Sequence, residues 1–163
     1  LVSLVKSRMA TEVCSLYLLD PTGDELVLAG TDGLAQTAVG QVRMHPWEGL
    51  TGLVAEVKAP VAVPEEARHP RYRYFPETGE ERYHSFLGVP IVDRREALGV
   101  LVVQTSRRRR FTRDEVRLMR AVAVPVGGLL VQLRLLQSLE SKEEERRGYQ
   151  RRMLEAMLAR EAS

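Results

Sequence analysis

Runs of apolar and alternating residues divide the chain into two predicted β-hairpins. Residues 12–20, EVCSLYLLD, are rich in β-branched, aromatic and aliphatic side chains and end at a strong turn signal, Pro-Thr-Gly-Asp. Residues 25–30 are expected to return as the second strand. Two further runs, residues 86–92 and 97–104, flank a charged turn. Residues 100–103 are continuously apolar, which predicts a central strand covered on both faces.

Apolar residues at helical spacing predict helices around these hairpins. Residues 1–9 have the pattern of the last turns of an amphipathic helix. Residues 50–57 place four aliphatic side chains on one face of a short helix, which Pro60 ends. Residues 61–63 then form a short strand.

A long helix is predicted after the second hairpin. Thr112 and Glu115 have the spacing of a capping box, in which each side chain satisfies a backbone N–H of the first turn. Pro125 lies inside the helix and predicts a kink or weak point. The pattern then turns polar, so we expect the folded domain to span residues 1–137. Residues 138–163 are expected to form a charged helical linker or coiled-coil tail.

Composition limits the classes of function. The chain has 163 residues, 44% of them hydrophobic and 28% charged, which suits one globular domain with an appendage. The net charge of +2 is too small to indicate nucleic-acid binding, and the arginines of residues 107–110 are best explained as a solvated loop. No signal peptide and no run of about 20 apolar residues is visible, so we expect no membrane partner. The chain begins with Leu, and we expect it to be a piece of a longer protein.

Reactive residues are few. Cys14 is the only cysteine, which excludes an internal disulfide, suits a cytoplasmic protein and favours a buried apolar role over redox sensing. The three histidines, His45, His69 and His84, lack metal-ligand spacing. We therefore predict no catalytic residue, no metal and no cofactor in this chain.

A polar loop rich in aromatic residues precedes the second hairpin and has the character of a ligand-binding loop held by a rigid sheet. Arg82 could hold a ligand carboxylate through two hydrogen bonds. The alternative is that Glu81 and Arg82 only pair with each other or with other surface charges. The candidate ligand-binding residues are Trp47, Tyr72, Tyr74, Glu81, Arg82, Tyr83 and Ser85.

The order of elements and several strings resemble a GAF domain over roughly residues 1–137. The carrying strings are EVCSLYLLD, GLTGLVAEVKAPVAV, the HPRY loop, and SFLGVPI followed by LGVLVVQ. The resemblance is most specific to the N-terminal GAF domain of enzyme I of the nitrogen-related phosphotransferase system, a phosphoenolpyruvate-protein phosphotransferase. GAF domains of nitrogen-fixation activators look similar over the same strings.

The resemblance implies an α+β fold, in which an antiparallel sheet has the terminal helices on one face and a ligand-pocket loop on the other. It also implies a homodimer through those helices, a downstream catalytic domain, and regulation by a small-molecule effector, with glutamine and 2-oxoglutarate as the associated nitrogen signals. Phosphoryl transfer would need a Thr-Ser-His site that this chain lacks. Gln104 and Thr105 stand where the cyclic-nucleotide-binding GAF signature has Asn-Lys, so cyclic nucleotides are not expected.

Two function classes remain open from the sequence. The first is a small-molecule sensor that alters a downstream enzyme or, in the related case, a nitrogen-responsive transcriptional activator. The second is a structural dimerisation module with a vestigial pocket, as the long amphipathic helix suggests. A well-formed cavity lined by residues 69–85 would favour sensing, whereas side chains that fill it would favour the structural role.

Overall fold

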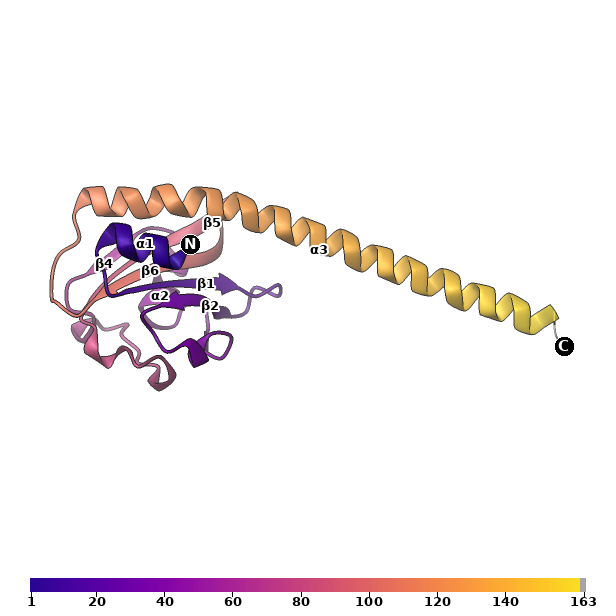
Figure 1. Cartoon of the computed structure of the whole chain (residues 1–163), viewed down its shortest axis with the longest axis horizontal. Helices are drawn as coiled ribbons and strands as arrows, with labels where there is room; N and C mark the ends of the chain where they lie inside the picture. The colour runs from indigo at the N-terminus through magenta and orange to yellow at the C-terminus, as the bar shows by residue number, and fades with distance from the viewer. Residues whose placement is uncertain (162–163) are drawn as a thin grey trace. The chain divides into compact units, whose positions relative to one another are not determined.

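The computed structural model describes residues 1–161 (Figure 1). Its elements, with η for a 3-10 helix, are α1 (Val2–Met9), β1 (Val13–Leu19), β2 (Leu26–Asp32), η1 (Gln36–Ala38), β3 (Arg43–Met44), α2 (Gly49–Val57), β4 (Val61–Val63), η2 (Glu66–Arg68), η3 (Pro76–Thr78), η4 (Glu80–Arg82), β5 (Ser85–Asp93), β6 (Glu96–Thr105) and α3 (Arg113–Glu161). Both hairpins, the short helix, the strand after Pro60 and the terminal helices are confirmed, with boundaries shifted by one or two residues.

The six strands form one antiparallel sheet in the order β3-β2-β1-β6-β5-β4. Strand β6 is therefore central, between β1 and β5. Its residues Val100, Leu101 and Val103 have no exposed surface, as the continuous apolar run predicted. The hairpin of β5 and β6 turns through Arg94 and Arg95, both at positive φ.

Alternation along the central strands separates the two faces of the sheet. Val13, Tyr17 and Gln104 belong to one face, because Val13 pairs with Gln104 and Tyr17 pairs with Val100 across β1 and β6. This face carries the larger core cluster, which includes α2 residues such as Val54. The opposite face lies against α1 and the first turns of α3 (Figure 1). The predicted α+β architecture, with a pocket opposite the terminal helices, is confirmed.

The capping box at the start of α3 is confirmed. The Thr112 N–H donates to the Glu115 carboxylate at 2.7 Å, and the Glu115 N–H donates to the Thr112 hydroxyl at 3.2 Å. Arg109 adds an ion pair to Glu115 at 2.8 Å and lies over the Phe111 ring. This arrangement gives one of the basic loop residues a structural role.

Helix α3 continues without interruption past Pro125, and the chain divides into two compact units, Leu1–Gly127 and Gly128–Ser163. The predicted domain boundary at residue 137 stays a prediction, and residues 162–163 of the predicted tail lie outside the described residues. By length and composition alone, α3 could cross a membrane. This is weak evidence, because core helices of water-soluble proteins meet the same criterion. The expectation of no membrane partner stays a prediction.

Candidate functional site

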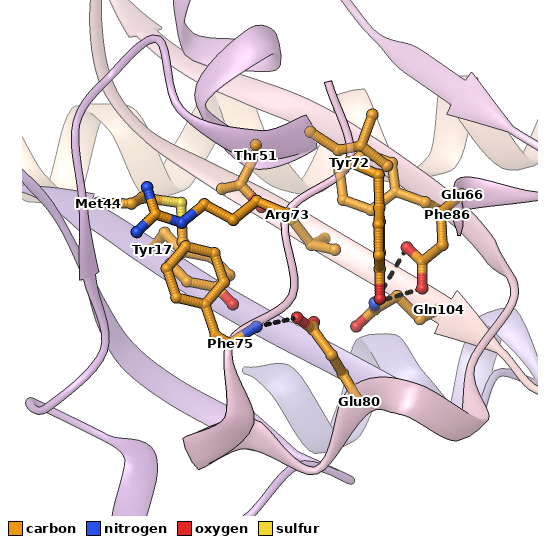
Figure 2. A pocket seen from close by; sticks show the side chains of 13 residues that line it. Tyr17, Met44, Thr51, Glu66, Tyr72, Arg73, Phe75, Glu80, Phe86 and Gln104 are labelled. Atoms are coloured by element: carbon orange, nitrogen blue, oxygen red, sulfur yellow. Dashed lines mark hydrogen bonds between the residues drawn. The ribbon is translucent and has the colours of Figure 1, made fainter. Parts of the chain in front are cut away.

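A cavity lies on the α2 face of the sheet, under the loop of residues 64–84 (Figure 2). The sheet supplies side chains from β1, β3, β5 and β6, and η2 and η4 supply two carboxylates from the loop. The lining residues are Tyr17, Met44, Gly49, Leu50, Thr51, Glu66, Tyr72, Arg73, Phe75, Glu80, Phe86, Val102 and Gln104.

Glu66 and Glu80 place two buried carboxylates on this cavity. Glu66 is 2% exposed and Glu80 is 8% exposed. The side-chain amide of Gln104 donates to both carboxylate oxygens of Glu66 at 3.3 Å, and the Phe75 N–H donates to Oε1 of Glu80 at 3.2 Å. The Glu66 N–H donates to the His84 carbonyl at 2.7 Å, which fixes the backbone of η2 against the start of β5.

Burial dominates the electrostatics of the two carboxylates. Loss of solvent raises the pKa of Glu66 from 4.5 to about 8, with a further rise from the charge of Glu80. Burial also raises the pKa of Glu80 to about 6. Among the described residues neither carboxylate forms an ion pair, whereas the neighbouring Glu65 pairs with Arg108 at 3.1 Å. Near neutral pH the Glu66 carboxyl is therefore mostly protonated, and Glu80 is the more readily ionised of the two.

Two tyrosines line the same cavity. Tyr17, on β1, is 4% exposed, and burial together with the charges of Glu80 and Glu66 raises its pKa. The same causes raise the pKa of Tyr72 to about 12. No hydrogen bond joins either hydroxyl to another side chain drawn in Figure 2. Both are neutral at physiological pH and can donate or accept a hydrogen bond.

Arg73 contributes a cation at the edge of the cavity. Its guanidinium forms an ion pair with Glu48 and lies 5.3 Å from the centre of the Phe75 ring. The Arg73 side chain is half exposed, so it faces both the cavity and the solvent. Release from Glu48 would leave it able to bind a ligand carboxylate.

The cavity is small. It leaves about 20 Å³ for the centre of a water-sized sphere, and roughly 10–15 Å³ of such space is needed for one water molecule. A group the size of water or ammonium fits as the structure stands. A larger effector requires the loop of residues 64–84 to move.

Of the seven residues predicted to bind a ligand, only Tyr72 lines this cavity. Trp47 is 61% exposed and stacks on His45, with ring centroids 4.7 Å apart. The Tyr74 hydroxyl donates to the Glu81 carboxylate at 2.8 Å on the surface. A ligand-binding role for Trp47, Tyr74 and Glu81 stays a prediction, which the position of the cavity does not favour.

Arg82 and Tyr83 lie at a different place from the cavity. Nε of Arg82 donates to the Tyr83 hydroxyl at 3.1 Å, and this hydroxyl donates to the Gly33 carbonyl at 3.0 Å. Both residues line a shallow surface hollow that also includes Lys6 and Ser106. Their geometry anchors the loop to the end of β2, and their contact with a ligand stays a prediction.

Ser85 is buried, and its hydroxyl is hydrogen-bonded to backbone groups of two segments. Its hydroxyl lies 2.8 Å from the Pro64 carbonyl and 3.0 Å from the Arg107 carbonyl, and it accepts a hydrogen bond from the Arg109 N–H at 2.7 Å. The hydroxyl thereby joins the beginning of the loop to the segment before α3. Because these contacts occupy the hydroxyl, a ligand-binding role for Ser85 stays a prediction without support from the geometry.

Sequence reasoning missed Glu66, Glu80, Tyr17 and Gln104. Glutamate is rarely buried, so a glutamate in a loop is expected to face solvent. Gln104 carried a usable signal, because it continues an apolar strand on the same face as Val102. A polar residue in that register points to a buried partner or ligand.

The fold, a six-stranded antiparallel sheet with helices on both faces, can be compared with known domain families. The family model for the GAF domain matches residues 1–130. The chain belongs to the GAF domain family, which confirms the resemblance inferred from the sequence strings.

Individual relatives narrow the comparison. A solved structure of the GAF domain from a phosphoenolpyruvate-protein phosphotransferase of Coxiella burnetii is 34% identical, with a TM-score of 0.79, covering 84% of this chain and 82% of that one. The phosphoenolpyruvate-dependent phosphotransferase system protein of Escherichia coli strain K12 is 37% identical over 135 residues, 83% of this chain. The chain spans only 18% of the length of that relative.

A relative of another kind is also similar. The Nif-specific regulatory protein of Herbaspirillum seropedicae is 31% identical over 131 residues, which are 77% of this chain and 24% of that protein. The chain is thus similar to parts of two different kinds of protein.

Proposed function

We propose that this GAF domain is the regulatory small-molecule-sensing part of a phosphoenolpyruvate-protein phosphotransferase, with glutamine or 2-oxoglutarate as effector. One observation carries the proposal: a cavity under a loop gathers polar groups whose pKa values are strongly raised. Perturbed groups of this kind cluster at functional sites. The similarity to GAF domains of phosphoenolpyruvate-protein phosphotransferases supports the choice of parent protein.

Sensing would operate through the loop of residues 64–84. Because the cavity is water-sized, glutamine or 2-oxoglutarate can bind only to a conformation in which the loop has opened. An effector that binds this conformation shifts the population toward it. The segment before α3 is hydrogen-bonded to the loop through Ser85, so the change would reach the helix that leads out of the domain.

In this proposal the chain regulates and does not catalyse. A downstream catalytic domain would carry the phosphorylated histidine, and a cytoplasmic location fits such a protein. The rings of two histidines have structural contacts: Nδ1 of His69 accepts from the Arg71 N–H at 3.1 Å, and Nδ1 of His45 lies 3.2 Å from the Asp24 carbonyl oxygen.

A structural dimerisation module is the second candidate. Two observations favour it: the cavity is nearly filled by side chains, and leucines on the terminal helices are exposed. Leu4 is 62% exposed, Leu133 46% and Leu136 57%. A homodimer through these helices is compatible with both candidates, because none of these leucines lines the cavity. Membership in a nitrogen-responsive transcriptional activator is a further alternative, supported by the Herbaspirillum relative.

Calorimetric titration of glutamine and of 2-oxoglutarate into the 163-residue chain tests the sensor proposal. The Arg73→Ala and Arg82→Ala variants locate the site. If the cavity binds the effector carboxylate, losing Arg73 should weaken binding about ten- to a hundredfold, and losing Arg82 should change little. The sequence-based choice of Arg82 predicts the reverse. If neither effector binds the native chain at millimolar concentration, the sensor proposal with these effectors fails and the structural module is favoured.

A further inference from the structure

The part of α3 beyond the first compact unit, residues 128–161 and here called the tail, carries an exposed stripe. The stripe consists of positions spaced alternately by four and three residues, which fall on one side of a helix that pairs with another. Both of its ends are apolar. The apolar members are 46% to 58% exposed and comprise Leu129, Leu133, Leu136, Leu154 and Met157. A stripe of this kind is stabilised by a partner that buries it.

Polar residues occupy the middle of the stripe. They are Glu140, Glu143, Arg147 and Gln150. All four are exposed, and the charged groups of Glu143 and Arg147 lie 3.8 Å apart on the same helix. Polar residues at such positions cost stability in a pair of helices, and they determine which register and direction of pairing form. The middle of the stripe therefore selects the partner.

The charges of the tail are divided into two adjoining blocks. Residues 140–145 contain four glutamates and one lysine, whereas residues 146–152 contain four arginines and no acidic residue. A parallel, in-register copy would place the acidic blocks side by side and the basic blocks side by side. A reversed copy places each acidic block beside a basic block, so the tail is complementary in charge to a second copy of itself.

We propose that the tail binds the tail of a second copy of this chain in the antiparallel direction, as a two-stranded coiled coil centred on Glu145. Each residue then faces the residue of the partner copy that is equally far on the other side of Glu145. Glu143 faces Arg147 of the partner copy, and the two-fold symmetry of the pair forms this contact twice. Glu140 faces the neutral Gln150 of the partner copy.

The apolar ends of the stripe match in the same arrangement. Leu136 faces Leu154 of the partner copy, and Leu133 faces Met157 of the partner copy. Each of these contacts also forms twice. The apolar side chains that are exposed on the single chain are thereby buried on both sides of the charged centre.

The flanks of the stripe contain both favourable and unfavourable contacts. In an antiparallel pair Leu139 approaches Met153 of the partner copy, and both side chains are 54% exposed on the single chain. Glu144 and Arg146 each approach the same residue of the partner copy. These like charges lie at the solvent-exposed edge of the pair, where water and salt screen their repulsion.

Parallel pairing is less favourable, because its like charges lie within the stripe. Glu140, Glu143 and Arg147 would each face the same residue of the partner copy. The side chains of a stripe are partly removed from water when two helices pair, and repulsion there is screened less than at the edge. The charge pattern therefore favours the antiparallel direction.

Antiparallel pairing goes beyond the proposed sensing function and does not depend on an effector. It places the end of one tail beside the beginning of the other. In a longer protein, a domain that follows the tail would then start beside the GAF domain of the partner copy. Regulation would act between the two copies.

Disulfide formation tests the direction of pairing. Leu133→Cys and Met157→Cys are prepared as separate variants, mixed in equal amounts and equilibrated at micromolar concentration in a glutathione redox buffer. A disulfide needs Cα atoms within about 7 Å, so the mixed 133–157 product should exceed each self-linked product at least about tenfold. The pair Glu140→Cys and Gln150→Cys repeats the test without removing an apolar contact. The native chain is the control and should form no disulfide, because Cys14 has no exposed surface.

Charge reversal tests the contact between Glu143 and Arg147. Glu143→Arg and Arg147→Glu should each weaken the homodimer at least about tenfold, and an equimolar mixture of the two variants should restore it. Restoration reports a contact between copies, because every chain in the mixture still lacks the ion pair within its own helix. Glu155→Arg makes the same change away from the stripe and should dimerise like the native chain. Sedimentation measures dimerisation, and circular dichroism confirms folding.

Three results would overturn antiparallel pairing: self-linked products as the main disulfides, variants with reversed charge that dimerise like the native chain, or a native chain that is monomeric at micromolar concentration. Self-linked products would keep the homodimer and reject its direction. A monomeric native chain would reject the homodimer as well. None of these results bears on the sensing proposal, which the titrations with glutamine and 2-oxoglutarate test separately.

Discussion

The side-chain amide of Gln104 donates to both carboxylate oxygens of Glu66, at 3.3 Å each. This contact joins the central strand of the sheet to the loop that covers the cavity. It is also one of the contributions that lower the pKa of Glu66, against the larger effect of burial. Gln104 stands where the cyclic-nucleotide-binding GAF signature has Asn. In this protein its side-chain amide is hydrogen-bonded to the buried Glu66.

The stability of the protein should fall as the pH rises from about 4.5 to about 8. The pKa of Glu66 is about 8 in the folded protein and about 4.5 in the unfolded chain, so the folded protein binds more protons between these values. Glu80, with a pKa of about 6, acts in the same direction over the lower part of the range. For one proton the slope is at most about 1.4 kcal/mol per pH unit.

Urea unfolding of the native chain and of Glu66→Gln at pH 5, 6.5 and 8 measures this dependence. The variant should be stabilised relative to the native chain at pH 8 and should have a flatter profile. Glu144→Gln, which removes an exposed charge on α3, is the control and should retain the native profile. A native profile that rises through this range would contradict the burial of an uncompensated Glu66.

Gly33→Ala should destabilise the fold much more than Gly30→Ala. Gly33 has a φ of +117°, and a Cβ there would lie 2.2 Å from the Glu12 carbonyl oxygen. A Cβ at Gly30 meets no atom within 4 Å. The cost at Gly33 should reach about 1–3 kcal/mol or more, because strain and a backbone clash add, and the cost at Gly30 should stay near about 0.5 kcal/mol. Equal midpoints of thermal unfolding for the two variants would refute the tight approach of β1 to residue 33.

Replacing Leu133 and Leu136 with Glu should convert a dimer into a monomer. The predicted dimer face comprises Val122, Val126, Leu129, Leu133 and Leu136, and exposed leucines in a stripe favour a partner helix. Gln132→Glu, a charge change at an exposed position in the same turn, is the control. Analytical ultracentrifugation at micromolar concentration measures the mass. A native chain that sediments as a monomer, unaffected by the leucine replacements, would show that the face needs no partner.

Cys14 should resist thiol reagents in the folded protein. It has no exposed surface, and burial raises its pKa to about 12, so almost no thiolate forms near neutral pH. Labelling with a maleimide should proceed at the rate of global unfolding, and 6 M guanidinium should make it fast. Rapid labelling of the native chain would show that strand β1 opens locally.

Incubation with labelled phosphoenolpyruvate should leave no acid-labile phosphate on this chain. His45, His69 and His84 all lack the Thr-Ser-His context of the phosphorylated histidine in the resembling family. The full-length parent protein, if it is a phosphotransferase, serves as the positive control. Stable labelling of any of the three histidines would contradict a purely regulatory role.

The fold was predictable from the sequence because its signals are local. The turn Pro21-Thr22-Gly23 and the capping box of Thr112 and Glu115 act within a few residues, and each is confirmed by short-range hydrogen bonds. The continuous apolar run that begins at Val100 predicted a central strand, and its burial confirms this.

The site was not predictable in the same way, because it depends on contacts between distant segments. Glu66 meets Gln104 across 38 positions of sequence, and the Tyr83 hydroxyl donates to the Gly33 carbonyl across 50. No local pattern distinguishes Glu66, which is buried, from Glu65, which forms surface ion pairs. The aromatic and cationic residues of the loop led to the prediction of Arg82 as the ligand contact. The ionisable side chains that line the cavity include Glu66 and Glu80 and not Arg82.

The hydroxyl of Ser85 contacts two segments, the start of the pocket loop and the segment before α3. A hydroxyl has a single proton, so Ser85 can donate to the Pro64 carbonyl or to the Arg107 carbonyl at any moment, while it accepts from the Arg109 N–H. The entrance of the pocket loop and the approach to α3 thus compete for the same proton. If the loop opens and Pro64 moves away, the Ser85 hydroxyl would donate to the Arg107 carbonyl alone. The hydrogen bond to the segment before α3 would then be strengthened. A Ser85→Ala protein would remove this exchange and uncouple the two ends.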